Sequence, residues 1–551
     1  MKTINTDVVV IGGGATGAGA LRDLAMRGFA TILVERADLA QGTSGRFHGL
    51  LHSGGRYVIS DPHSATECAQ ENEILRRIHA DSVEETGGLF VVGPHDDPEF
   101  STRFLPAARD TQVPAEELDV AEALRIEPRL NPGIQRAFRV RDGSIDGWGM
   151  VWGAVESAKA YGAQCLTYHR VTKVENADGQ VSQVICTDEK TGEEVRINCR
   201  AAINCGGPWA GQIAKMAGCH GVDVVPGRGI MIAMNHRLVN HVVNRCIHPA
   251  DGDIIVPAHT VSIIGTTDQK EDDPDFLVIR NSEVQQMLDS GEDLVPGFRK
   301  ARAVHAWAGA RPLVKDSRVD ASDTRHMSRG MSIIDHSHRD GVKGFFTIAG
   351  GKLTTYRLMA KNIVDALLEQ LGEFVECTTD TEAVPPRAVR THKVTDRLKE
   401  AETDRFDDPI ICECELLPRS TIEKELAKQP TANLDDIRRR TRLGMGPCQG
   451  TFCGMRAAGI MHETLADRLD REENADRTSS MLRLFVKNRY SGLESLMYGE
   501  QLREATLNKW ILAGNLDIDH LPAPTEQAVR ATGDLELIHG RPAMAQVKEK
   551  E

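Results

Sequence analysis

A glycine-rich turn near the N-terminus constrains the fold of this chain more than any other feature of its sequence. Gly12, Gly14 and Gly17 have the spacing G-x-G-x-x-G between a predicted strand and helix of the segment 7–35, whose second strand ends in Glu35. These glycines permit a tight turn, backbone approach to a pyrophosphate at the helix N-terminus, and close helix–strand packing. Glu35 is placed to accept hydrogen bonds from ribose hydroxyls. Because strand, helix and acid are in register, we prefer a dinucleotide-binding βαβ unit to a purely structural strand–turn–helix.

Length and charge restrict the remaining possibilities. The chain has 551 residues, which exceeds what one core usually serves, so we expect two or three domains. A formal net charge of -14 argues against nucleic acid as a partner. No run approaches the roughly 20 apolar residues of a membrane-spanning helix, and the N-terminus has no signal-peptide pattern. We therefore expect a cytoplasmic protein whose membrane contact is peripheral or made through partners.

Five short motifs follow the glycine turn, at 42–57, 204–210, 265–268, 309–313 and 350–357. The first ends in His-Ser-Gly-Gly-Arg-Tyr and the last reads Gly-Gly-Lys-Leu-Thr-Thr-Tyr-Arg. In this order the set resembles the motifs of FAD-dependent glycerol-3-phosphate dehydrogenases over about residues 7–371. The resemblance implies FAD as the cofactor. With the glycine turn and Glu35, it implies a cofactor site that includes Thr43, Ser44, Gly207, Gly351, Lys352 and Thr354.

The same resemblance implies glycerol 3-phosphate as the substrate. Arginine suits phosphate because its planar guanidinium pairs bidentately with phosphate oxygens and stays charged. By resemblance, Arg56, Arg311 and Arg329 handle the phosphate, with Tyr57 beside them. Each arginine could instead be a solvated charge or the partner of a carboxylate. Lys352 could contact the flavin or help to stabilise its reduced form, or could be a lysine at the entry of a helix.

The group that takes up the hydroxyl proton is not fixed by the sequence. Single-chain relatives carry a Lys-Gly-Ser-His segment where this chain reads Arg-Gly-Ile-Met at 228–231, so Met231 replaces the expected histidine. His52 and, close to it, His48 are the remaining titratable candidates, because an unperturbed histidine titrates near neutral pH. Either histidine could equally well pack in the core or against the flavin. We take His52 as the candidate.

A second cofactor is predicted by four cysteines crowded into a short part of the chain. Cys412 and Cys414 form Cys-x-Cys, and Cys448 and Cys453 form Cys-x4-Cys after thirty-three further residues. Four soft thiolates suit an iron–sulfur cluster or zinc. Structural zinc usually uses Cys-x2-4-Cys pairs. The unequal spacing favours a 2Fe-2S cluster, and the unit resembles the 2Fe-2S domain of bacterioferritin-associated ferredoxin. The other eight cysteines are interpreted as small buried hydrophobes.

The predicted layout is α/β and α+β, with a Rossmann-like FAD-binding domain, an inserted mixed-sheet substrate domain, a small helical 2Fe-2S domain and a helical tail. The boundaries are 1–375 for the interleaved FAD and substrate parts, 376–408 for a linker, 409–465 for the cysteine unit and 466–551 for the tail. The arginines at 438–442 are interpreted as a solvated helix face. Six apolar side chains of the tail could form a docking surface for partner subunits, namely Phe485, Tyr490, Leu496, Tyr498, Trp510 and Ile511.

With the cysteine unit included, the chain resembles the FAD-carrying members of the anaerobic, three-subunit glycerol-3-phosphate dehydrogenases over nearly its whole length. The resemblance implies oxidation of glycerol 3-phosphate and one-electron transfer through the cluster to partner subunits and, indirectly, to quinone. It also implies peripheral attachment to the inner face of the cell membrane. Two alternatives stay open: a D-amino-acid-oxidase-like dehydrogenase of another small amino or hydroxy acid, and an electron-transfer subunit without catalytic activity.

Overall fold

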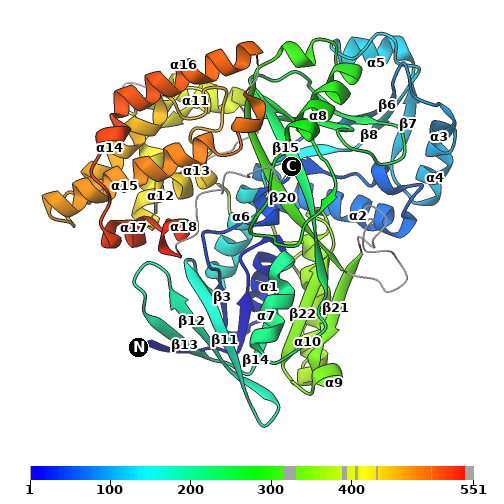
Figure 1. Ribbon diagram of the computed structural model, residues 1–551. Coiled ribbons are helices and arrows are strands. Elements are labelled where there is room, and N and C mark those ends of the chain that lie inside the picture. The colour runs from blue at the N-terminus through cyan, green and yellow to red at the C-terminus, as the bar shows by residue number, and fades with distance from the viewer. Residues whose placement is uncertain are drawn as a thin grey trace, which may run out of the picture.

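A mostly parallel six-stranded sheet carries the glycine-rich turn (Figure 1). Residues of its strand β2 alternate between two cores, with Val8 and Val10 on one face and Val9 and Ile11 on the other. Both faces are buried, which explains the uninterrupted apolar run. The strands in spatial order are β10 (Gln164–Leu166), β3 (Thr31–Val34), β2 (Val8–Ile11), β14 (Ala201–Asn204), β22 (Phe345–Gly350) and β21 (Met331–Asp335).

Helices cover one face of this sheet and a second, smaller sheet lies on the other. The computed structural model describes residues 2–314, 330–387, 394–403, 407–429, 432–497 and 499–539. The helices are α1 (Ala15–Met26), α6 (Gly147–Ala160) and α10 (Tyr356–Leu371), with α1 between the other two. The smaller sheet and α7 (Ala210–Met216) share the opposite core, and its order is β1 (Lys2–Asn5), β13 (Glu194–Asn198), β12 (Gln180–Asp188) and β11 (His169–Ala177).

A long mixed sheet forms the second half of the molecule. Its main path is β19 (Gln269–Lys270), β15 (Val224–Met234), β18 (Val261–Gly265), β17 (Ile254–Ala258), β16 (Val242–Arg245), β6 (Gly88–Val92), β8 (Arg136–Val140) and β7 (Ala115–Leu118), with β20 (Ala303–Val314) paired to β15. Around it lie α2 (Pro62–Ile78), α3 (Glu99–Thr102), α4 (Phe104–Asp110), α5 (Val120–Ile126) and α8 (Asn281–Leu294).

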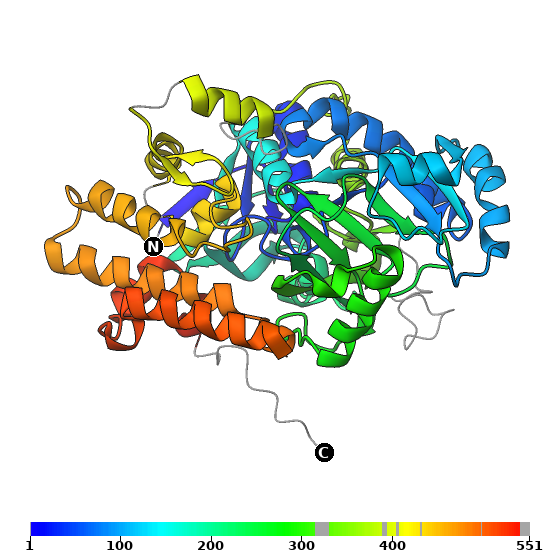
Figure 2. The same ribbon diagram turned by 90° about the horizontal axis from the view of Figure 1, so that it is seen from above.

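The C-terminal helices gather on one side of both halves (Figures 1 and 2). Residues between 411 and 485 share a separate apolar core that includes Ile411, Cys412, Leu434 and Cys453. The elements are β23 (Ile410–Cys412), β24 (Leu417–Pro418), α12 (Arg419–Lys428), α13 (Leu434–Thr441), α14 (Cys453–Leu465), α15 (Arg471–Tyr490), α16 (Gly499–Leu516), α17 (Glu526–Thr532) and α18 (Leu535–Ile538), preceded by α11 (Val394–Thr403).

The segment before α11 packs on the first sheet's helices instead of leaving them. Arg22 of α1 donates to the carbonyl of Thr379 at 3.0 Å, and Arg387 pairs with Asp146 at the start of α6 at 2.9 Å. Arg387 also donates to the carbonyl of Arg440 in α13 at 2.9 Å. Residues 379–387 therefore contact both the helices of the first sheet and helix α13 of the C-terminal part.

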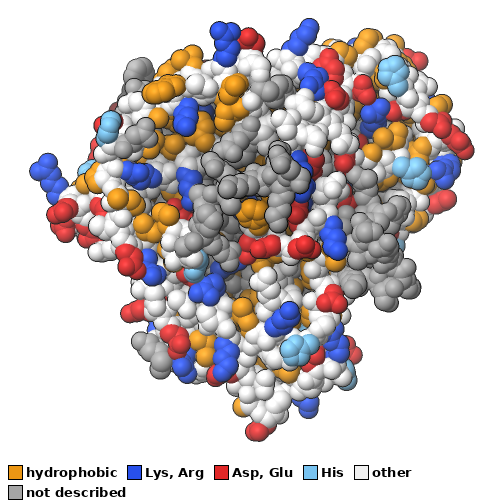
Figure 3. Space-filling view, viewed as in Figure 1, with side chains coloured by type: hydrophobic (Ala, Val, Ile, Leu, Met, Phe, Trp, Pro, Cys, Tyr) orange, Lys and Arg blue, Asp and Glu red, His pale blue; other side chains and the backbone are white. Residues whose placement is uncertain are grey.

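The predicted fold class is confirmed. The mostly parallel sheet carries the glycine turn, the mixed sheet is inserted between its strands in the sequence, and helices form the C-terminal part. Within the described residues, no helix is long and apolar enough to cross a membrane. On the face shown in Figure 3, basic and acidic side chains are interspersed with apolar ones.

Candidate active site and cysteine centre

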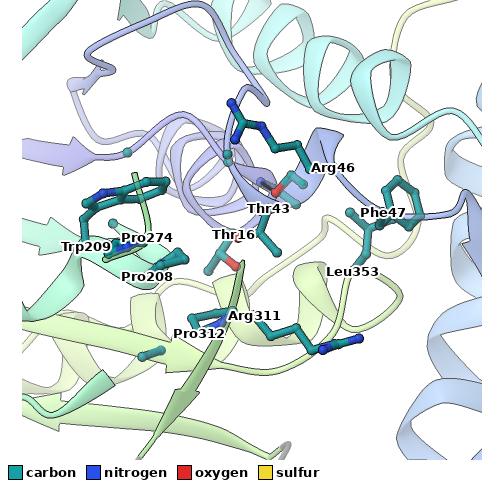
Figure 4. A pocket seen from close by; sticks show the side chains of 18 of the residues that line it. Thr16, Thr43, Arg46, Phe47, Pro208, Trp209, Pro274, Arg311, Pro312 and Leu353 are labelled. Carbon is teal, nitrogen blue, oxygen red and sulfur yellow. Dashed lines mark hydrogen bonds between the residues drawn. The ribbon is translucent and has the colours of Figure 1, made fainter. Parts of the chain in front are cut away.

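A cavity of about 1610 Å³ opens where the two sheets meet, at the carboxyl ends of the parallel strands. This volume exceeds the usual range for a single small ligand, so the cavity has room for a dinucleotide and a small substrate together. Figure 4 shows Thr16 and Thr43 near its centre, with Arg311 below them and Trp209 to one side. The lining comes from stretches far apart in the sequence: 11–16, 34–37, 41–44, 205–209, 266–268, 311–313 and 348–353.

The glycine turn forms one end of the cavity. Gly12 has a positive φ of 112°, and a Cβ there would lie 2.6 Å from the carbonyl oxygen of Cys205, so only glycine fits. Gly14 lines the cavity, whereas Gly17 lies outside the lining and packs against the carbonyl of Gly12. Glu35 accepts from the amide of Gly13 at 2.6 Å. The bare backbone cradle and the acid at the strand end fit a dinucleotide such as FAD.

The predicted flavin-contacting residues divide into lining and support. Thr43, Ser44, Gly207, Gly351 and Lys352 line the cavity. Thr354 does not line it; it is fully buried, and its hydroxyl accepts from the backbone amide of His52 at 3.1 Å. The hydroxyl of Ser44 accepts from the amide of Ala15 at 2.8 Å, which ties this segment to the start of α1.

Two of the three predicted phosphate-handling arginines lie in the cavity wall. Arg56 pairs with Asp253 at 2.7 Å, and Arg311 pairs with Asp268 at 3.0 Å. Burial opposes the charge of Arg56, but Asp253 outweighs it and raises the pKa of that guanidinium. Both arginines are therefore held charged and in place before any anion arrives. Arg329 lies outside the described residues.

Lys352 and Tyr57 contact one another in the wall of the same cavity. The ammonium of Lys352 donates to the hydroxyl of Ser64 at 2.8 Å and lies 4.7 Å from the centre of the Tyr57 ring. Both residues line the cavity. A cation over an aromatic face is an attractive contact, so the two side chains fix one another.

His48, rather than His52, lies next to the position of the missing histidine. A Cβ built on Gly265 would be 3.1 Å both from Cβ of His48 and from Cγ of Met231. Nδ1 of His48 accepts from the amide of Leu50 at 3.2 Å, which leaves the ring proton on Nε2. Burial and the charges of Arg56 and Arg311 lower the pKa of His48 to about 3. His52 also lines the cavity, with its ring 6.2 Å from that of His48.

Sequence reasoning missed the carboxylates that hold the two arginines. Asp268 belongs to a quoted motif, but its spacing gave no hint of a pairing with Arg311. Asp253 follows no motif and precedes β17 directly. A correct strand register would have revealed Asp268. Gly227 of β15 pairs with Arg311 of β20 on one side and with Lys270 of β19 on the other, and β19 begins directly after Asp268.

The four predicted metal ligands come together in the C-terminal unit. Cys412 ends β23, Cys453 begins α14, and the thiols contact in two pairs, Cys412 with Cys453 and Cys414 with Cys448. The thiol of Cys414 and nearby backbone amides lower the pKa of Cys448 to about 5, against the burial that opposes it. A Cβ on Gly446 would collide with Cys414, so glycine is required there. Four thiols in two pairs fit a 2Fe-2S cluster, which these cysteines would hold.

The interpretation of residues 438–442 as a solvated helix face is wrong. Helix α13 is the part of the cysteine unit that faces the first sheet. Arg439 pairs there with Asp38 at 3.0 Å, whereas Arg442 pairs with Glu415 within the cysteine unit at 3.1 Å. Tyr168 donates to Asp436 of the same helix at 2.7 Å. A run of arginines has the same sequence pattern whether its side chains face water or carboxylates. The charge pattern alone therefore could not predict that these arginines are buried.

Part of the expected docking surface is buried in the chain itself. Phe485 packs against Gly444, Gly450 and Gly454 of the cysteine unit, and Leu496 joins the core of the mixed sheet. These two side chains are therefore not available to a partner. Trp510 and Ile511 are exposed, and Tyr498 lies outside the described residues.

Two family models match this chain. Residues 7–366 match the model of the FAD dependent oxidoreductase family, and residues 410–463 match the BFD-like [2Fe-2S] binding domain. The fold and cavity thus define an FAD-dependent oxidoreductase joined to an iron–sulfur unit. The predicted cofactors, FAD and a 2Fe-2S cluster, are confirmed by these matches.

Curated relatives are similar over nearly the whole chain. The A-type subunit of the anaerobic glycerol-3-phosphate dehydrogenase of Escherichia coli K12 is 38% identical, covering 93% of this chain and 96% of the relative. The protein of the same name from Haemophilus influenzae is 37% identical, covering 98% of each. The chain therefore belongs to the FAD-dependent oxidoreductase family, in the group of these anaerobic glycerol-3-phosphate dehydrogenase subunits.

Solved structures support the fold at lower identity. A glycerol-3-phosphate dehydrogenase from Bacillus halodurans complexed with FAD is 21% identical with a TM-score of 0.58, covering 98% of this chain and 95% of that one. An L-alpha-glycerophosphate oxidase from Mycoplasma pneumoniae is 19% identical with a TM-score of 0.55, covering 70% of this chain and 100% of the other.

Proposed function

We propose that this protein oxidises sn-glycerol 3-phosphate to dihydroxyacetone phosphate with FAD and passes the electrons through its 2Fe-2S cluster to partner subunits and, through them, to quinone. The observation that most directly supports this proposal is the position of Arg56 and Arg311. Both are paired with carboxylates in the wall of the cavity that begins at the glycine turn. The names of the curated relatives support the same substrate.

The chain's own residues supply binding and proton handling. Arg56 and Arg311 receive the phosphate dianion, because each guanidinium is a positive charge that an aspartate fixes in the cavity wall. Bound FAD supplies the hydride acceptor. His48, which carries its ring proton on Nε2, is proposed to donate to the substrate's carbinol oxygen, and His52 is the proposed acceptor of the hydroxyl proton.

Partner subunits and membrane attachment belong to this proposal. The relatives are named as subunits of a dehydrogenase, which supports a complex whose other members accept the electrons. We propose that the chain works in the cytoplasm, attached to the inner face of the membrane through those partners. Exposed Trp510 and Ile511 of α16 are proposed contact residues.

A D-amino-acid-oxidase-like dehydrogenase is the alternative, since Arg311 could bind a carboxylate equally well. The test is an anaerobic visible spectrum of the purified protein with glycerol 3-phosphate, glycerol, lactate and a D-amino acid in turn. We expect bleaching of the flavin by glycerol 3-phosphate alone. Bleaching by a carboxylate substrate in its place would select the alternative. A bound flavin that no substrate bleaches would indicate an electron-transfer subunit without catalytic activity.

A further inference from the structure

One β-hairpin connects the arginines of the cavity to the cysteine unit. Its strands are β17 (Ile254–Ala258) and β18 (Val261–Gly265), paired antiparallel along their whole length. Asp253, directly before β17, pairs with Arg56, and Asp268, shortly after β18, pairs with Arg311. The open end of this hairpin, residues 253 and 266–268, therefore supports both proposed phosphate-binding side chains.

The opposite end of the hairpin touches the cysteine unit. His259 is at the tip, and its Nδ1 lies 2.8 Å from Oε2 of Glu415. Glu415 directly follows the ligand Cys414 in the sequence. A Cβ built on Gly446 would be 3.3 Å from the hydroxyl oxygen of Thr260 and 3.3 Å from the sulfur of Cys414. The tip thus meets the cysteine unit on the Cys414 side.

The contact is a buried group of three ionisable side chains. The side chain of His259 is 4% exposed and that of Glu415 is 0% exposed. Arg442, at the end of α13, pairs with the same carboxylate at 3.1 Å and is 10% exposed. Removal of one partner from such a group leaves a buried charge without compensation, so its members hold one another in one arrangement.

Glu413 gives the contrast within the same loop. It precedes Cys414 as directly as Glu415 follows it, but its side chain is 58% exposed and pairs with Arg456 of the cysteine unit itself, at 2.5 Å. The two glutamates therefore place equal charges one residue away from Cys414. One of them contacts the substrate half of the molecule and the other does not.

We propose that His259 is a positioning residue for electron transfer, which holds the Cys414 side of the cluster site in place relative to the arginines that receive the substrate. The inference rests on the proposed function and extends it. In the step concerned, one electron leaves the reduced flavin and the oxidised cluster gains it, while no bond between heavy atoms forms or breaks. Transfer through protein depends steeply on separation. A short hairpin fixed at both ends keeps the two sites at a constant separation.

The test uses the full-length protein with both cofactors, in four variants: His259→Ala, the conservative His259→Gln, Glu415→Gln and the control Glu413→Gln. Three properties are measured. They are the electron paramagnetic resonance spectrum and midpoint potential of the chemically reduced cluster, the rate of flavin bleaching by glycerol 3-phosphate, and the rate of cluster reduction that follows.

We expect His259→Ala and Glu415→Gln to change the cluster spectrum and to slow cluster reduction by roughly tenfold or more, as misplacement of a reacting group does. Flavin bleaching should stay within about twofold of the wild-type rate, because no cavity contact is removed. His259→Gln, which keeps a polar side chain next to Glu415, should lie between His259→Ala and the wild type. Glu413→Gln should resemble the wild type in all three measurements.

A readout without the cofactors covers the case in which a variant fails to assemble its cluster. Hydrogen exchange of the cluster-free protein should rise at residues 410–418 in His259→Ala, but not in Glu413→Gln. Wild-type spectra, exchange and cluster reduction in His259→Ala would overturn the proposal, as would equal changes in Glu413→Gln. Failure of glycerol 3-phosphate to bleach the wild-type flavin would refute the proposed function instead, since the spectrum and the exchange do not need the substrate.

Discussion

The cavity and the cysteine centre are built in opposite ways. The cavity collects its lining from stretches between residues 11 and 359 and from residues near the C-terminus at 535–539, and its two proposed phosphate-binding arginines are held by Asp253 and Asp268. The cysteine centre takes all four ligands from 412–453, around one small core. In a site assembled from distant segments, several residues support each functional side chain, so the loss of one leaves others in place. A cluster held by four cysteines needs every one of them. Substitutions should therefore have graded effects in the cavity and all-or-none effects at the cysteines.

The largest effect should come from Cys448→Ser. A hydroxyl binds iron weakly, so the cluster should be lost or destabilised while the flavin half keeps its own core and cavity. Substrate should still bleach the flavin, but electron delivery to quinone in the reconstituted complex should fall to near background. Iron analysis, anaerobic bleaching and substrate-to-quinone turnover are measured on the same preparation. Undiminished turnover after confirmed iron loss would show that the unit is structural and not an electron relay.

In the cavity, Arg311→Ala should weaken substrate binding without removing the flavin. Loss of a charged hydrogen-bonding partner corresponds to about 1.5–3 kcal/mol, or a rise in KM for glycerol 3-phosphate of roughly 10- to 150-fold. Arg139→Ala is the control, because Arg139 pairs with Glu116 in the open, at 45% exposure. Steady-state kinetics and flavin content are compared. Equal losses with unphosphorylated glycerol would mean that Arg311 supports the fold and does not bind phosphate.

The supporting aspartate should matter less than the arginine it holds. Asp268→Asn keeps an oxygen that can accept from Arg311 but removes the charge, so KM should rise by about tenfold or less. Steady-state kinetics on the same substrate decide the order of the two effects. A larger loss for Asp268→Asn than for Arg311→Ala would assign the direct role in catalysis to Asp268.

The same contrast explains how far the sequence could be interpreted. The strand, turn and helix around Gly12, and the four cysteines, are local patterns, so their structures were predicted well. The pairings of Arg56 with Asp253 and of Arg439 with Asp38 depend on segments about 200 and 400 residues apart, and no local pattern reveals them. The place of His48 beside Met231 is likewise visible only once β18 brings Gly265 between them. Tertiary contacts of this kind decide which charges are buried.

The remaining expected effect is on stability and not on catalysis: a pH dependence of the FAD-binding part, from His79. This residue is buried at the end of α2 with its Nε2 2.6 Å from the hydroxyl of Tyr356, and burial, with Arg22 and Arg387 nearby, lowers its pKa to about 3. As the pH falls, His79 takes up a proton near pH 6.5 in the unfolded chain but only near pH 3 in the folded protein. Stability should therefore be complete above about pH 6.5 and decrease as the pH falls below it.

At pH 5 this single group should remove about 2 kcal/mol of unfolding free energy, at roughly 1.4 kcal/mol per pH unit. His79→Gln cannot take up that proton. Its unfolding free energy should therefore decrease less steeply with falling pH in acid than that of the wild type, by the slope that about one proton contributes. Denaturant unfolding followed by flavin release at pH 7 and pH 5 measures the difference, with His338→Gln as the control because that side chain is 91% exposed. The wild type and His79→Gln differ in slope only if the buried ring stays neutral. Parallel acid limbs for all three proteins would mean that other groups, and not this histidine, limit the stability of the flavin half in acid.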